Sequence, residues 1–141
     1  MARIKLSVPE HFIFSAKINI RISDINYGGH VGNDKILSLI HEARVLFLKE
    51  HQVSELKFGE VSLIMSNVVI EFKKELFYGD PVLIKIAVTE LTNVGFELFY
   101  VVMKDDETIA ALARTGMVCY DYEAKKIASF PADIKSRFQR L

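Results

Sequence analysis

The stretch IRISDINYGGHVGN, residues 20–33, joins two segments whose hydrophobic patterns have different periods. Before it, apolar residues occupy every second position from Phe12 to Ile22, which is typical of a strand with one buried face. After it, from about Asn33 to Gln52, the apolar residues follow a helical period and fill most of the circumference. The sequence therefore predicts a half-buried strand, a glycine-rich turn and a long buried helix, in that order.

Four more extended segments follow the helix, separated by turn residues such as Tyr78-Gly79-Asp80-Pro81 and Asn93-Val94-Gly95. They are Val61–Lys74, Val82–Val88, Phe96–Met103 and Thr108–Tyr120. Their short connections predict antiparallel neighbours in chain order, and a short terminal helix follows from Pro131. A helix that is apolar nearly all round needs cover on most sides, so we expect an α+β fold in which a curved antiparallel sheet wraps around one long buried helix. A two-layer α+β plate with a less buried helix is the competing geometry.

Composition narrows the class of protein. The 141 residues are 50% hydrophobic and carry 18 basic against 18 acidic side chains, which predicts a single domain over residues 1–141 with a well-filled core. The absence of net charge and of a basic run argues against nucleic acid or an anionic membrane as partner. Because Cys119 is the lone cysteine, an intramolecular disulfide is excluded. No segment has the pattern of a signal peptide or a membrane span. We therefore expect a soluble cytoplasmic protein.

The opening stretch, the helical Glu42-Ala43-Arg44 and the turn Phe77-Tyr78-Gly79-Asp80-Pro81 together resemble the hotdog-fold acyl-CoA thioesterases, specifically the 4-hydroxybenzoyl-CoA thioesterase-like group. The resemblance covers most of the chain. It implies hydrolysis of a thioester of coenzyme A, or of acyl carrier protein, by a homodimer or by a homotetramer built as a dimer of dimers. It also implies active sites at subunit interfaces, no metal, and no cofactor other than the coenzyme A of the substrate.

Asn26 departs from the pattern of that family. Members that hydrolyse aromatic thioesters have an aspartate at the matching position, and the acyl-carrier-protein thioesterases have Asp, Asn and His at the positions of Asn26, Gly28 and His30. Only His30 of that trio is retained. An amide cannot act as a carboxylate base, although it can hydrogen-bond the thioester oxygen or the attacking water, as well as form an ordinary Asx turn.

The start of the helix is the predicted oxyanion site. Free backbone N–H groups around Val31, Gly32 and Asn33 lie at the positive end of the helix dipole and can stabilise charge on a carbonyl oxygen. Gly28, Gly29 and Gly32 would let substrate approach the backbone closely, and they also suit a tight turn. Tyr27 and Asp24 complete the expected substrate-binding set, with Asp24 also expected to anchor the loop through backbone hydrogen bonds.

Glu42 is the leading candidate for the catalytic base, with Asn26 and His30 expected to orient the carbonyl and the water, and His30 is the alternative base. His30 titrates near neutrality and can orient water or accept its proton. Glu42 has apolar helical neighbours, which predicts burial and a raised pKa for its carboxyl group; an ion pair with an arginine is the equal alternative. Asp24 is the next carboxylate in line after Glu42.

The remaining reactive side chains have mainly structural interpretations. His11 and His41 lack a second ligand or triad partner at useful spacing, and Cys119 is expected to be a buried, inert thiol. A basic group, Arg114 with Lys125 and Lys126, either meets the phosphates of coenzyme A or is a solvated surface.

Two other functions stay open. A hotdog enoyl-thioester hydratase also uses an Asn and a His in the loop before the helix, but here Asn26 and His30 are one residue further apart than in that motif, and Tyr27 stands where it has proline. A non-catalytic acyl-thioester binding protein would explain the missing aspartate.

Overall fold

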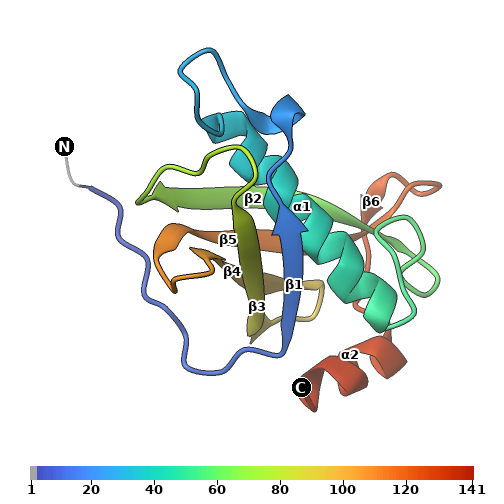
Figure 1. Cartoon of the computed structure of the whole chain (residues 1–141). Helices are drawn as coiled ribbons and strands as arrows, with labels where there is room; N and C mark the ends of the chain where they lie inside the picture. The colour runs from blue at the N-terminus through green and yellow to red at the C-terminus, as the bar shows by residue number, and fades with distance from the viewer. Residues whose placement is uncertain (1–2) are drawn as a thin grey trace.

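The computed structural model describes residues 3–141, and its elements follow the order expected from the sequence (Figure 1). The elements are β1 (Phe14–Asn19), a 3-10 turn η1 (Ile22–Asp24), α1 (Asn33–Glu50), β2 (Ser62–Phe72), β3 (Pro81–Leu91), β4 (Gly95–Lys104), β5 (Ile109–Asp121), β6 (Lys126–Ile127) and α2 (Ala132–Gln139). The short β6, which pairs with the end of β5, and η1 were not predicted.

The sheet is antiparallel, with strand order β1-β3-β4-β5-β2. The expectation of neighbours in chain order is confirmed for β3, β4 and β5 but is wrong for β2, which pairs with β5 from Ser62 opposite Tyr120 to Phe72 opposite Ala111. The free side of β3 is taken by β1, with Phe14 opposite Ile86. The connection through residues 73–80 therefore crosses from one side of the sheet to the other, and its Leu76 is buried in the core.

The sheet curves around α1 (Figure 1), which confirms the expected hotdog fold. One stripe of the helix, including Ile36, Ile40 and Phe47, packs on side chains of β1 and β3 such as Ile18 and Ile84 in one continuous core. Because these side chains recur at helical spacing on α1 and at every second position on the strands, each element presents one apolar face to the other.

The sequence predicts a helix that is buried on nearly all sides, but α1 is buried on one side only. The face of α1 that points away from the sheet is exposed, and it includes His41, Glu42, Val45 and Leu46. Val45 and Leu46 are 46% and 38% exposed. The sheet of one chain covers only one side of the helix, so its second apolar face has no cover among residues 3–141.

Both ends of the chain add to the packing. Starting after Pro131, α2 places Ile134 and Phe138 in the core, and Phe138 contacts the aromatic rings of Phe47, Phe58, Phe96 and Phe130. At the other end, Leu6 and Phe12 pack against a small cluster around Phe99 and Leu112. No helix among residues 3–141 has the length and apolar character needed to cross a membrane.

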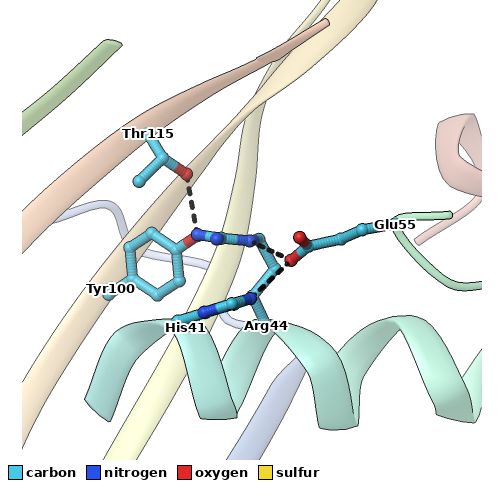
Figure 2. Close-up of polar contacts among 5 residues, drawn as sticks. All are labelled: His41, Arg44, Glu55, Tyr100 and Thr115. Atoms are coloured by element: carbon cyan, nitrogen blue, oxygen red, sulfur yellow. Dashed lines mark hydrogen bonds and ion pairs between the residues drawn. The ribbon is translucent and has the colours of Figure 1, made fainter. Parts of the chain in front are cut away.

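A polar cluster ties α1 to the sheet (Figure 2). Arg44 is 4% exposed; its Nε donates to Glu55 Oε1 at 2.9 Å and its Nη1 to the Tyr100 hydroxyl at 3.1 Å. The Tyr100 and Thr115 hydroxyls are 2.7 Å apart, and His41 Nε2 lies 3.2 Å from Glu55 Oε1. Burial opposes the charge on Arg44, but Tyr100 and Glu55 outweigh it, so the pKa of the guanidinium is raised. For Tyr100, in contrast, burial disfavours the charged form and raises the pKa of the hydroxyl.

We expect Arg44→Ala to lower the free energy of unfolding by about 3 to 5 kcal/mol, because removing one partner leaves the others unpaired in a low-dielectric interior. Chemical denaturation followed by circular dichroism measures this change. The exposed Lys57→Ala is the matched control and should stay within about 0.5 kcal/mol of the parent chain. A loss of less than about 1 kcal/mol for Arg44→Ala would show that this cluster is not a structural tie.

Candidate active site

The loop before α1 is closed around Asn26. The Asn26 N–H donates to the His30 carbonyl at 2.9 Å, and the Asn26 carbonyl accepts the Gly29 N–H at 3.1 Å. The side-chain Oδ1 of Asn26 accepts the Gly28 N–H at 2.9 Å, which is an Asx turn. Gly29 has a φ of +83°, a conformation that favours glycine. Tyr27 lies fully exposed in this turn.

Asp24 anchors the loop, as expected. Its side chain is buried, and its Oδ2 accepts the Arg21 N–H at 2.9 Å. Its carbonyl accepts the Gly32 N–H at 3.2 Å, which ties the beginning of the loop to the start of the helix. Through these two bonds, Asp24 fixes the backbone of the loop that carries the other candidate residues.

Of the three backbone N–H groups that were predicted to bind an oxyanion, only one has no hydrogen-bond partner among residues 3–141. The Val31 N–H donates to the Leu76 carbonyl at 2.8 Å and the Gly32 N–H to the Asp24 carbonyl, so neither is free for a substrate. The N–H of Asn33, the first residue of α1, has no hydrogen-bond partner among residues 3–141. A helix leaves its first N–H groups without intrahelical partners, and here the neighbouring carbonyls satisfy two of the three predicted donors.

His30 is held in one tautomer by its neighbour. Its Nδ1 lies 3.1 Å from the Val31 carbonyl oxygen, and because that oxygen can only accept, Nδ1 carries the hydrogen. The lone pair of the neutral ring is then on Nε2. This atom lies 3.8 Å from Oε1 of Glu75, so a proton taken up by Nε2 would meet a nearby negative charge.

Gly28 keeps the space between Asn26 and His30 free of side chain. A Cβ at Gly28 would lie 3.2 Å from Asn26 Oδ1 and 3.4 Å from His30 Nε2. Asn26 Oδ1 has a second lone pair besides the one used by Gly28, so it can accept one more hydrogen bond in this space. A water molecule there could be oriented by the amide and deprotonated by the imidazole.

His30 and Asn33 line the same hollow, which has a volume of about 220 Å³. The other walls come from Val31 and Ile36, from Phe72 at the end of β2 and residues 73–76 after it, and from Ala110 near the start of β5. A basic ring nitrogen and an unpaired N–H at a helix start can together serve water attack on a carbonyl carbon. Among residues 3–141, no group of three or more His, Cys, Asp or Glu side chains could hold a metal ion.

Glu42 does not have the buried surroundings that we expected. Its side chain is exposed, and it follows Asn33 by nine positions, about 13 Å along a helix axis. The buried arginine of this helix, Arg44, pairs with Glu55 instead. Glu42 therefore does not join His30 and Asn33 in the hollow of its own chain.

The structural interpretations of the other side chains agree with the structure. His41 is an exposed partner of Glu55, and His11 is exposed. Cys119 is fully buried, and burial raises the pKa of its thiol to about 11, which leaves it protonated and inert. The three basic residues suggested for coenzyme A lie elsewhere: Arg114 is in mid-strand near Glu97, and Lys125 and Lys126 follow the far end of β5 from Ala110.

Several residues near the site were missed from the sequence. Lys73, Lys74 and Glu75 line the hollow, but in the sequence they look like an ordinary charged strand end. Arg44 lies away from the hollow, but its burial had a detectable signal: it follows the apolar Ile40 by four positions, and a charge on an apolar helical stripe needs a partner.

Comparison with known proteins places the chain in a family. A model of the thioesterase-like superfamily matches residues 20–138. A 1,4-dihydroxy-2-naphthoyl-CoA hydrolase of Microcystis aeruginosa is 29% identical over 119 residues, covering 82% of this chain and 86% of the relative.

Solved structures share the fold. The 1,4-dihydroxy-2-naphthoyl-CoA thioesterase of Synechocystis superposes with a TM-score of 0.83 at 22% identity, over 91% of this chain and 96% of that one. A gentisyl-coenzyme A thioesterase has a TM-score of 0.78 at 19% identity, over 86% and 99%. The family model and the hydrolase of Microcystis aeruginosa, together with the shared fold, confirm the resemblance found from the sequence and the expectation of a thioester hydrolase. The chain belongs to the thioesterase-like superfamily.

Proposed function

We propose that this protein hydrolyses the thioester of an aromatic acyl-CoA to the free acid and coenzyme A. The observation that carries the proposal is that His30, with Nε2 free to accept a proton, and the unpaired Asn33 N–H line one hollow at the start of α1. Thioester hydrolysis needs a base for water and a donor for the carbonyl oxygen, and this hollow offers both.

In the proposed reaction, His30 Nε2 takes a proton from water while the water oxygen forms a bond to the thioester carbon. The electron pair of the C=O bond moves to oxygen, where the Asn33 N–H and the positive end of α1 stabilise the charge. When the intermediate collapses, the C–S bond breaks and the imidazolium returns its proton to the departing thiolate. Acid and thiol are formed in equal amounts.

Two further residues assist in this scheme. Asn26 orients the water through Oδ1 without titrating, which is the role left to an amide where relatives of the aromatic group have an aspartate. Glu75, 3.8 Å from His30 Nε2, stabilises the imidazolium while it holds the proton. Since Glu75 is exposed, we expect its contribution to be small.

An aromatic acyl group is favoured by the relatives, whose names include hydrolases of dihydroxynaphthoyl-CoA and gentisyl-CoA. The test is release of free thiol from a panel of aromatic, short aliphatic and long aliphatic acyl-CoA substrates. We expect the highest kcat/KM on a hydroxylated aromatic thioester. A clear preference for aliphatic chains would overturn the substrate class while leaving hydrolysis intact.

The same panel separates the other two functions. Crotonyl-CoA converted to 3-hydroxyacyl-CoA without free thiol would make the protein a hydratase. Tight acyl-CoA binding without turnover of any substrate would make it a binding protein.

We also propose a homodimer as the minimum assembly. The edge of β2 that faces away from β5 has no strand beside it among residues 3–141, and an unpaired edge tends to pair with another chain. The exposed Val45 and Leu46 give α1 an apolar face that a partner could cover. Glu42 lies one helical turn before them, so in a dimer it could reach the site of the other subunit.

Light scattering at micromolar concentration is expected to give a mass of about twice 16.1 kDa, or four times for a dimer of dimers. Met65→Lys, at an exposed position of β2, should shift the equilibrium toward monomer because it places a charge on the pairing edge. A stable monomer of the unaltered chain would contradict this assembly and any role of Glu42 across it.

A cytoplasmic location is the last part of the proposal. It is supported by the single, buried cysteine, which suits a reducing compartment. Fractionation of cells that express the tagged protein tests it, and recovery from an oxidising compartment would contradict it.

A further inference from the structure

The His51 ring lies at the C-terminal end of α1, whereas the candidate active site lies at the start of this helix. Its Nε2 is the only buried side-chain nitrogen or oxygen among residues 3–141 that has no hydrogen-bond partner. Buried polar atoms normally have such a partner, so this exception needs a physical reason. The reaction proposed above makes no use of this histidine.

The imidazole packs between aromatic side chains of the two helices. Its centroid lies 4.9 Å from that of Phe47 on α1 and 5.5 Å from that of Phe138 on α2, both in edge-on arrangements. Phe47 and Phe138 are themselves buried in the core. A neutral histidine presents an apolar body to such neighbours, so His51 is one of the side chains on which α2 docks.

Hydrogen bonds fix the backbone on both sides of this contact. The Val53 N–H donates to the Leu48 carbonyl at 3.1 Å, a bond that closes the C-terminal end of α1. From α2, Arg137 Nη1 donates to the His51 carbonyl at 2.8 Å. The end of α1 and the docked α2 are therefore joined by one hydrogen bond and by the aromatic packing around the imidazole.

The surroundings of His51 disfavour its protonation. Burial lowers the pKa of the imidazole, the Glu50 carboxylate opposes this effect, and the Arg137 cation adds to it. The negative end of α1, which can stabilise a protonated histidine, already binds Arg137 through the His51 carbonyl. His11 and Glu90 also lie beside α2, in a hollow of about 240 Å³ that the end of this helix lines. A proton on Nε2 would therefore lie near the Arg137 cation in an apolar contact.

We infer that His51 is an acid-sensitive latch: its neutral ring holds α2 on the end of the core, and a proton on Nε2 releases the helix. In the protonated ring both nitrogens carry hydrogen, so Nε2 would become a buried donor with no acceptor among residues 3–141. The strands keep their pairing when α2 is released, because this helix of eight residues places two side chains, Ile134 and Phe138, in the core and pairs with no strand.

Docking of α2 therefore depends on pH in one direction. Above the pH at which a free histidine titrates, the ring is neutral in both the docked and the released state, and docking has its full strength. As the pH falls from there toward the lower pKa of the docked ring, the docking constant of α2 falls by up to about tenfold per pH unit. Below that pKa the ring is protonated in both states, so further acid has no additional effect on docking.

The latch is tested by hydrogen exchange of the backbone amides, expressed as protection relative to the unfolded chain, at about pH 7.5 and about pH 5.5. In the parent chain we expect the protection of α2 to fall by about tenfold at the lower pH, while amides of β4 keep theirs. His51→Phe keeps an aromatic ring and cannot take up a proton, so its α2 should stay protected at both pH values. His11→Gln is the matched control and should behave as the parent, since this exposed histidine also lies beside α2.

A titration of the parent chain followed by NMR needs no substitution. The His51 ring should titrate at a lower pH than the exposed rings of His11 and His41. A His51 ring that titrates together with these two would overturn the latch, as would equal protection of α2 at both pH values in the parent. The same conclusion would follow if His51→Phe lost protection at low pH as the parent does, or if His11→Gln abolished the effect.

Discussion

Replacing His30 by alanine is expected to lower kcat on the best thioester by about a hundredfold to ten-thousandfold, the usual contribution of a general base. The Val31 carbonyl fixes the hydrogen on Nδ1, so Nε2 is the basic atom that faces the space beside Gly28. KM should change much less than kcat, because the proton transfer occurs only in the transition state. Steady-state release of free thiol by parent and variant measures both constants.

Glu42→Gln is the companion variant. The exposed position of Glu42, about 13 Å along α1 from Asn33, predicts a small effect if each site is built from one chain. A large fall in kcat for Glu42→Gln with nearly full turnover for His30→Ala would instead identify Glu42, contributed by another subunit, as the base.

The fold could be predicted because its signals are local and strong. The alternation from Phe12 to Ile22 and the helical period after Asn33 each require one apolar face, and turns such as Gly79-Asp80-Pro81 separate the strands. The position of β2 could not be predicted in this way. Strand pairing depends on which edge is free, and β1 occupies the edge of β3 that β2 was expected to take.

The site could be predicted only in part. The loop sequence located His30, Asn26 and the helix start, because glycine, Asx turns and unpaired helix N–H groups follow local rules. It could not show that the Val31 N–H donates to the carbonyl of Leu76, which is distant in the sequence. Nor could it show that the Gly32 N–H donates to the carbonyl of Asp24.

Burial was the other property that local patterns misjudged. Apolar neighbours on α1 predicted a buried Glu42, but the sheet covers only the opposite face of the helix. Arg44 is the opposite case, because it is a charged residue that is buried. Tyr100 and Glu55, from other parts of the chain, stabilise its charge there.

Asn33→Pro isolates the backbone donor from every side chain of the site. Proline lacks an N–H but is well tolerated at the first position of a helix, which Asn33 occupies. Gly32 has φ of −69° and ψ of 151°, an extended conformation that suits a residue before proline. The fold should therefore be kept, as circular dichroism and thermal unfolding can verify, while the oxyanion loses its donor.

Hydrolysis at the start of α1 is tested most directly by the ratio of kcat for Asn33→Pro to kcat for Asn33→Ala on the best aromatic acyl-CoA. Both variants remove the asparagine side chain, and only the proline removes the N–H. Loss of one oxyanion donor typically costs about a hundredfold to a thousandfold in kcat, and we expect a ratio in that range. Equal kcat values for two folded variants would contradict hydrolysis at the start of α1.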